Sequence, residues 1–405
     1  MRIDFAGAMR AATKLTLTQK PMEATRIIQG ALRLGGEQSS MRPEHGRIVE
    51  RRAIEDSLII FPPSIARLDI DAHSPLIDIA ATLEHNRVPG LRLDAVRHVR
   101  PRRVPEIPDG ALFLSRSYAC SAGSRNYKLY VPQRQPGGRR ALLIMLHGGT
   151  QDADNFAAGT RMNALAEKHG FLVAYPVQSR SANASLCWNW FKPEDQIRDA
   201  GEPCIIAGIT NEIISEFEID PRRVFIAGLS AGGAMAAVMG ATYPDLFAAV
   251  GIHSGLPYQC AADLPSAFSA MRGDTGPKRR KSRASLSFDR SLRIPTIIFH
   301  GAADHIVHPS NAAKMVEALA TTGDTTVRVM VPSSAGRSYT QAVTRDRTGT
   351  TMIEAWLIDG SGHAWSGGSL DGTYTDPRGP DASSEMLRFF FNTGRPQCVE
   401  PKGSP

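Results

Sequence analysis

The chain has 405 residues, of which 42% are hydrophobic and 21% charged, and its formal net charge is +7. This length and composition are typical of a globular chain with one large domain and an appendage. The basic residues occur in short runs without a recognisable nucleic-acid-binding module, so we expect no nucleic-acid partner. The five cysteines form no C-x-x-C pair, and no apolar run is long enough to span a bilayer.

Residues 1–110 are predicted to form a helical N-terminal extension and a linker that is partly disordered. Met9, Ala12 and Leu15 recur at helical spacing, and Pro21 stands near the first turn of a second helix. Residues 36–108 show no sustained periodicity and are rich in Arg, Pro, His and Asp. The first residues lack a charged segment followed by an apolar one, so we expect no signal peptide. We therefore expect a cytoplasmic protein, with secretion as the alternative.

Residues 111–395 are predicted to form one catalytic domain, and residues 396–405 a C-terminal tail. An alternating pattern predicts a strand at 126–131, and mostly apolar runs predict strands at 141–146, 171–176, 247–252, 296–301 and 352–358, with a further strand that begins at Val224. Helical patterns at 162–169, 205–217 and 381–391 lie between or after them. This alternation indicates a mostly parallel sheet with crossover helices. Chemistry in such sheets gathers at the carboxyl ends of the strands.

The strongest motif is Gly228-Leu229-Ser230-Ala231-Gly232, which lies between a predicted strand and a predicted helix. This is the context that a G-x-S-x-G nucleophile elbow requires. Glycines suit the two flanking positions because a side chain there would collide with the neighbouring strand or helix. The motif predicts Ser230 as a nucleophile.

A serine hydroxyl needs an imidazole to accept its proton and an acid to orient that imidazole. Asp304, a few residues past the strand at 296–301, is the candidate acid. His363, on a glycine-rich loop after the strand at 352–358, is the candidate base. The other histidines near these strand ends are two rivals for the base, His305 and His308, and two expected structural residues, His253 and His300.

A tetrahedral intermediate also needs backbone N–H donors for its oxyanion. Ala231, directly after the nucleophile, is expected to supply one. The segment His147-Gly148-Gly149-Thr150 follows an earlier strand and is expected to supply the other, from Gly149 or, as second choice, Thr150. His147 is expected to brace this loop.

Aromatic residues near these loops are candidates for lining a substrate pocket, although core packing would equally account for Trp188 and Trp190, while the place of Trp365 two residues after the candidate base favours the site. The candidates are Trp188, Trp190, Tyr258 and Trp365, together with Phe191. The basic segment 272–291 is predicted to be a surface insertion, either a lid edge or a disordered loop. A disulfide between Cys187 and Cys204 is conceivable if the chain is exported.

Five segments together resemble the polyhydroxybutyrate (PHB) depolymerase family of serine esterases, over about residues 112–393. They are 147–157, 187–191 (Cys-Trp-Asn-Trp-Phe), 228–235, 300–304 and 362–368, and the stretch 374–382 looks similar too. The resemblance implies an α/β-hydrolase fold and hydrolysis of carboxylic esters, in some members those of a 3-hydroxybutyrate storage polymer. It makes Ser230 the nucleophile, Asp304 the acid and His363 the base. The family often has cysteine at the position of Gly149. Its polymer-degrading members are often exported and often carry a separate polymer-binding domain, and this sequence shows neither a signal peptide nor such a domain.

The sequence therefore predicts a serine esterase that needs no metal or cofactor and acts on a small, oligomeric or polymeric ester through an acyl-enzyme. We find no P-loop and no H-E-x-x-H motif that would compete with this interpretation. The alternatives are an acyltransferase or peptidase with the same three residues, or a non-catalytic protein. The last would bind polyester granules or lipid surfaces through its N-terminal helix and basic segments.

Overall fold

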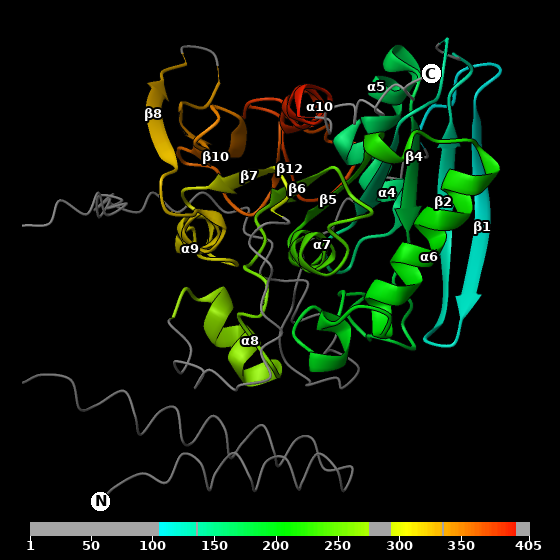
Figure 1. Cartoon of the computed structure of the whole chain (residues 1–405), viewed down its shortest axis with the longest axis horizontal. Helices are drawn as coiled ribbons and strands as arrows, with labels where there is room; N and C mark the ends of the chain where they lie inside the picture. The colour runs from blue at the N-terminus through cyan, green and yellow to red at the C-terminus, as the bar shows by residue number, and fades with distance from the viewer. Residues whose placement is uncertain (1–104, 135–136, 275–292, 334–335, 394–405) are drawn as a thin grey trace, which may run out of the picture. The chain divides into compact units, whose positions relative to one another are not determined.

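The computed structural model describes residues 105–134, 137–274, 293–333 and 336–393 (Figure 1). Several predicted segments lie outside the described residues. They are the N-terminal helices, the linker up to residue 104, the basic segment over residues 275–291 and the C-terminal tail. Within the described ranges, no helix is both long enough and apolar enough to cross a membrane.

The described residues form a ten-stranded sheet with the order β1-β2-β4-β3-β5-β6-β7-β10-β9-β8. The strands from β4 to β10 in this order run parallel, and the pairs at both ends are antiparallel. The bounds are β1 Leu112–Cys120, β2 Gly123–Val131, β3 Leu142–Leu146, β4 Leu172–Pro176, β5 Val224–Leu229, β6 Ala249–His253, β7 Thr296–Gly301, β8 Thr325–Val331, β9 Tyr339–Arg345 and β10 Thr351–Ile358. Two short strands, β11 Trp365–Ser366 and β12 Thr375–Asp376, pair separately.

Helices cover both faces of this sheet, as Figure 1 shows. The helices α6, α7 and α9 contact strands on one face, while α4, α5 and α10 form a group that covers the other. Their bounds are α4 Ala153–Thr160, α5 Met162–His169, α6 Gly201–Glu216, α7 Ala231–Thr242, α8 Leu264–Met271, α9 Ser310–Leu319 and α10 Ala382–Asn392, with 3₁₀ turns η1 Pro193–Gln196 and η2 Pro221–Arg223. Because both faces are covered, every residue of the central strands β3 to β7 is buried.

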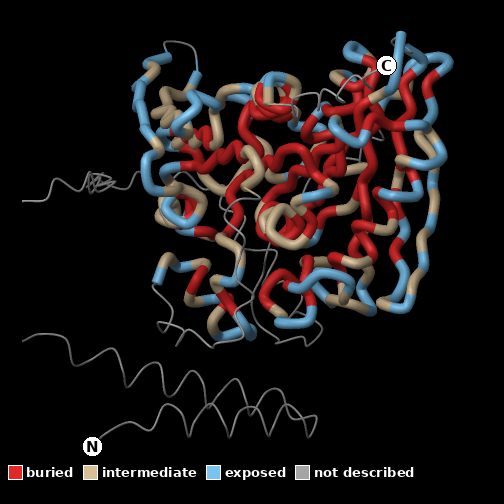
Figure 2. Tube along the Cα trace, in the orientation of Figure 1, coloured by how far each residue is buried: buried red, intermediate tan, exposed pale blue. Residues whose placement is uncertain are grey.

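The core lies along these central strands and under α10 (Figure 2). Phe225 of β5 stacks on Phe390 of α10, with ring centroids 5.0 Å apart. The N-cap of α10 is Asp381, whose carboxylate accepts a hydrogen bond from the backbone N–H of Ser384. The helix is therefore held both at its start and along its buried face.

The parallel sheet with crossover helices confirms the predicted α/β-hydrolase fold. The predicted strands and helices recur within a few residues of their expected bounds. The sequence did not predict β1, β8 and β9. Of these, β8 is an edge strand in which six of the seven residues are exposed, although its segment is rich in the Thr and Val that strands favour.

Candidate active site

The chain turns sharply between β5 and α7, and Ser230 stands at that turn. Its backbone has φ 57° and ψ −119°, a conformation that side-chain-bearing residues rarely adopt. A Cβ added at Gly228 would lie 2.4 Å from the carbonyl of Gly232, and one at Gly232 would lie 2.1 Å from the carbonyl of Leu146. The backbones of β5, α7 and β3 are thus too close for any side chain. The turn is fixed by this packing, and Ser230 remains partly exposed.

The carboxylate of Asp304 lies in the loop after β7 and is buried. Its Oδ2 is 2.7 Å from Nδ1 of His363, and its Oδ1 accepts hydrogen bonds of 2.9 Å from the N–H groups of Ile306 and Val307. Nε2 of His300 lies 3.5 Å from Oδ2. Burial by itself would raise the pKa of this carboxyl, but the hydrogen bonds and the neighbouring imidazoles outweigh it and hold the pKa below its usual value. Asp304 is therefore a carboxylate at neutral pH.

His363 lies in the loop after β10 and faces that carboxylate. A carboxylate only accepts hydrogen bonds, so the proton of a neutral His363 is on Nδ1 and Nε2 carries a lone pair. The loop is held against β7, since a Cβ at Gly301 would lie 2.3 Å from the carbonyl of Ser361. The rivals His305 and His308 are both exposed, and Nδ1 of His308 instead lies 2.9 Å from the hydroxyl of Ser310.

His253, at the end of β6, connects the serine turn with the histidine loop. Its carbonyl accepts the N–H of Ser230 at 2.8 Å, and its Nε2 accepts the N–H of Ser366 at 2.9 Å. Its ring stacks on Phe299 and on Trp365. Burial, with smaller contributions from His300 and His363, puts the pKa of this imidazole well below its ordinary value. His253 is therefore neutral, and its ring nitrogen can accept a backbone hydrogen bond.

His300 is a second buried imidazole. Its Nε2 lies 2.8 Å from the carbonyl of Val307, and burial lowers its pKa. His253 and His300 are thus the packed, hydrogen-bonded residues that their positions in strands indicated.

The loop after β3 is braced by His147 and Gln151. Nε2 of His147 accepts the N–H of Gln178 at 3.1 Å, and Oε1 of Gln151 accepts the N–H of Gly148 at 2.9 Å. The N–H of Thr150 donates to the carbonyl of Ser185 at 2.9 Å. That donor is therefore used within the protein, which favours Gly149 over Thr150 as a donor to a ligand.

Gly149 itself is tightly surrounded. A Cβ at this position would lie 2.5 Å from the sulfur of Cys187. Glycine is therefore the residue that fits while Cys187 keeps its place. The carbonyl of Leu146 packs against Gly232 of α7, so the loop that carries Gly149 lies next to the first turn of that helix, which begins at Ala231.

Glu202, in the first turn of α6, is a buried carboxylate that the sequence analysis missed. It accepts hydrogen bonds from the backbone and side-chain amides of Asn189 at 2.7 and 2.8 Å, from Arg125 at 3.0 Å and from the side chain of Gln178. These partners hold the segment 178–190, which supplies the carbonyl of Ser185 and the sulfur of Cys187 to the β3 loop. The available signal was a charged residue on a helix whose other inward positions are mostly apolar.

The aromatic candidates lie mostly in the core. Trp188 and Trp365 have no exposed surface, and Nε1 of Trp365 donates to the hydroxyl of Ser383 at 3.0 Å. The structure therefore corrects their assignment to an open pocket, because a fully enclosed side chain offers no surface to a ligand. Trp190 is 7% exposed and packs edge-to-face on Phe191.

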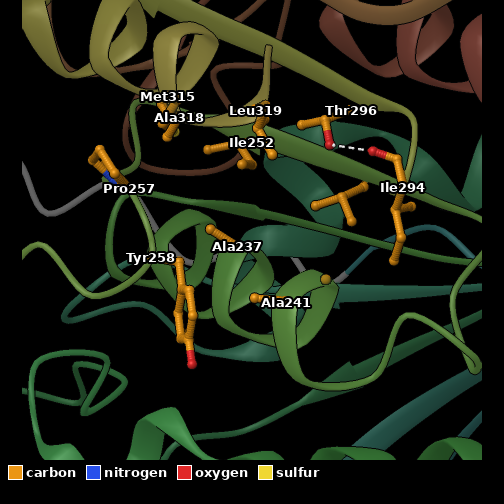
Figure 3. Close-up of a pocket in the computed structure, with 12 residues that line it drawn as sticks. Ala237, Ala241, Ile252, Pro257, Tyr258, Ile294, Thr296, Met315, Ala318 and Leu319 are labelled. Atoms are coloured by element: carbon orange, nitrogen blue, oxygen red, sulfur yellow. Dashed lines mark hydrogen bonds between the residues drawn. The ribbon is translucent and has the colours of Figure 1, made fainter. Parts of the chain in front are cut away.

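Tyr258 is half-buried, and its hydroxyl donates to the carbonyl of Gln196 at 2.9 Å. It lines an apolar cavity between α7 and α9, shown in Figure 3. The wall is formed by Ala237, Gly240, Ala241, Val250, Ile252, Pro257, Tyr258, Ile294, Thr296, Met315, Ala318 and Leu319. Ser230, Asp304 and His363 do not line this cavity, so it is separate from the serine turn.

The disulfide considered between Cys187 and Cys204 is not formed. Cys187 lies against Gly149, whereas the sulfur of Cys204 lies 3.8 Å from that of Cys120. All four cysteines in the described part of the chain are free thiols. The described residues also hold no group of three or more His, Cys, Asp or Glu side chains that could bind a metal ion.

The strand order, the strained serine turn and the Asp304–His363 pair define an α/β-hydrolase with a serine at its elbow. The sequence model of the family "Esterase PHB depolymerase" matches residues 125–326. The chain is 30% identical over 271 residues to feruloyl esterase B of Neurospora crassa, an alignment that covers 64% of this chain and 86% of that protein. The chain belongs to this family of carboxylic ester hydrolases, which confirms the predicted resemblance.

Two further comparisons concern a sequence relative and a solved structure. It is 33% identical over 265 residues to poly(3-hydroxyalkanoate) depolymerase C of Paucimonas lemoignei, covering 64% of this chain and 61% of that protein. The chain therefore spans less than two thirds of the length of this relative. Among solved structures, an acetyl xylan esterase from Aspergillus awamori aligns with a TM-score of 0.49 and 19% identity, over 66% of this chain and 94% of that one.

Replacing Glu202 with alanine should lower the free energy of unfolding by about 3–5 kcal/mol, because Arg125 would remain buried without its partner. Urea unfolding followed by tryptophan fluorescence measures this change. Glu216→Ala, which removes a partly exposed ion pair with Arg116, is the matched control and should cost less than about 1 kcal/mol. Equal, small losses in both variants would contradict a structural role for Glu202.

Proposed function

We propose that this chain hydrolyses carboxylic esters with Ser230 as nucleophile, His363 as general base and Asp304 as the acid that orients it. The observation that carries the proposal is the 2.7 Å hydrogen bond between His363 and Asp304, at the sheet edge where the strained serine turn also lies. Membership of an esterase family supports the same reaction.

The reaction would proceed in two halves. Nε2 of His363 takes the hydroxyl proton of Ser230 as Oγ attacks the ester carbonyl carbon, and a tetrahedral intermediate forms. The intermediate collapses to an acyl-serine as the imidazolium protonates the leaving alkoxide. Water then attacks the acyl-serine by the same proton transfers in reverse, which releases the acid and restores Ser230.

Asp304 would act through His363. Its carboxylate holds the proton of the neutral imidazole on Nδ1, which leaves Nε2 free to act as a base, and it stabilises the imidazolium that forms. The lowered pKa of Asp304 supports this role, since the group stays ionised throughout the neutral range.

The backbone N–H groups of Ala231 and Gly149 would stabilise the negative oxygen of the intermediate. Ala231 opens α7, so its N–H is one of the free donors at a helix start. Gly149 is favoured over Thr150 because the N–H of Thr150 already donates to Ser185.

The substrate class proposed is a short-chain or hydroxyalkanoate ester. Similar proteins carry the names poly(3-hydroxyalkanoate) depolymerase and poly(3-hydroxybutyrate) depolymerase, and others are named feruloyl or acetylxylan esterases. What these names share is an ester of a carboxylic acid, and this is the bond that the proposed site would cleave.

Ser230→Ala should abolish hydrolysis of p-nitrophenyl butyrate, because no other group would form the acyl-enzyme. Release of p-nitrophenol from purified wild type and variant, followed by absorbance, measures the loss. Wild-type protein without activity would contradict the proposal. If wild type and variant were equally inert and both sedimented with polyester granules, a binding protein would be the better interpretation.

Asp304→Asn should lower kcat by a factor of the order of 10⁴, because an amide no longer selects the productive imidazole tautomer. Steady-state kinetics on the same ester checks this. Glu317→Gln, which removes a carboxylate charge from an exposed position of α9, is the control and should keep wild-type kcat. A variant at Asp304 within threefold of wild type would rule out its proposed role.

A panel of substrates should show which esters the chain hydrolyses best. We expect turnover of p-nitrophenyl butyrate and of soluble 3-hydroxybutyrate oligomers, measured by p-nitrophenol release and by titration of the released acid. Amorphous polyhydroxybutyrate tests whether the chain alone also acts on a polymer. Cleavage of a peptide amide in preference to all esters would instead favour a peptidase.

A further inference from the structure

Two cysteines from distant parts of the chain face each other beside the edge strand of the sheet. Cys120 is the last residue of β1, and Cys204 lies in the first turn of α6. Their sulfur atoms are 3.8 Å apart, although the residues are separated by 84 positions in the sequence. Both side chains are half-buried. The proposed mechanism uses neither.

The packing of β1 along α6 sets this distance. Side chains alternate along β1, so Arg116, Tyr118 and Cys120 lie on the same, half-buried face of the strand. Arg116 pairs with Glu216 near the end of α6, and the ring of Tyr118 packs so closely on Gly208 that a Cβ there would lie 2.2 Å from it.

Contacts therefore run along most of α6, from its first turn to its last residue. A strand fixed along its length cannot easily move one end away from the helix. The approach of the two sulfur atoms is thus a consequence of the packing and not of two freely rotating side chains.

We propose that Cys120 and Cys204 form a disulfide when the chain meets a disulfide-bearing oxidant such as oxidised glutathione. A disulfide has an S–S distance of about 2.0 Å. The two sulfur atoms therefore need to approach by less than about 2 Å to reach bonding distance.

The bond would form by two thiol–disulfide exchanges. One cysteine thiolate attacks a sulfur of oxidised glutathione, forms a mixed disulfide and releases one glutathione thiolate. The second cysteine thiolate then attacks the protein sulfur of that mixed disulfide and releases the other glutathione. Altogether the two cysteine thiols lose two electrons and two protons, and the glutathione disulfide is reduced to two thiols.

The other described cysteines are poorer candidates for this chemistry. Burial raises the pKa of the Cys187 thiol to about 11 and that of Cys260 to about 12, so little thiolate is present at neutral pH. Burial and the neighbouring Cys120 also raise the pKa of Cys204. Oxidation is therefore expected to be faster at mildly alkaline pH. The choice of Cys120 as the partner of Cys204 rests on the 3.8 Å between their sulfur atoms.

The bond would stabilise the fold more than it would alter the reaction. It closes a long loop and so restricts the unfolded chain. It also ties the edge strand β1 to the helix start that carries Glu202. Neither sulfur belongs to the proposed catalytic groups, so kcat per folded molecule should stay the same.

The test uses the full chain, fully reduced and then incubated with oxidised glutathione at pH 8. We expect the number of free thiols to fall by two, and digestion without reductant to yield one cross-linked peptide pair that joins Cys120 to Cys204. The midpoint of thermal unfolding should rise by about 5–10 °C and return to its reduced value with dithiothreitol.

Single variants separate this pair from the remaining cysteines. Cys120→Ser and Cys204→Ser should each lose the cross-link and the thermal shift, whereas Cys260→Ser should keep both. A cross-link to Cys187 or to Cys398, which lies outside the described residues, would overturn the proposal. So would glutathione adducts without a protein disulfide. Because the peptide map is made on the wild-type chain, the result does not depend on either serine variant folding.

Discussion

The close approach of three backbone segments is the constraint on which the candidate site depends. Gly228 and Gly232 let β5, the first turn of α7 and the end of β3 meet at distances that admit no side chain. Ser230 is held in an unfavourable backbone conformation by that packing, and the surrounding buried strands compensate for the strain. The same contact brings the β3 loop beside the helix start. One steric condition thus positions both the serine and the donors that would serve it.

A second set of interactions, a network of buried polar groups, holds the loops that surround the candidate site. Glu202 and Arg125 are enclosed, and the carboxylate is satisfied by amide and guanidinium donors, as burial of a charge requires. Through Gln178 the network reaches His147, and through Ser185 it reaches Thr150. Irregular loops gain a defined shape here because their backbone groups find partners on a regular helix.

The central fold and the residues at its strand ends could be predicted because each signal is local. A largely apolar run marks a covered strand, and Ser230, Asp304 and His363 each follow one. Side-chain direction was not predictable, and so Trp365, two residues from His363, lies in the core. Glu202 stands in no motif. The partner of Cys204 depends on how β1 lies along α6, which sequence spacing does not encode.

His253 binds the serine turn through its carbonyl and the histidine loop through its imidazole, and its ring is clamped between two aromatic rings. Both loops are therefore hydrogen-bonded to one residue of the buried strand β6. Because both loops are hydrogen-bonded to this one residue, a shift of His253 would act on both loops at once. For the proposed nucleophile Ser230 and base His363, this shared hydrogen-bonding partner couples the positions of the loops that carry them.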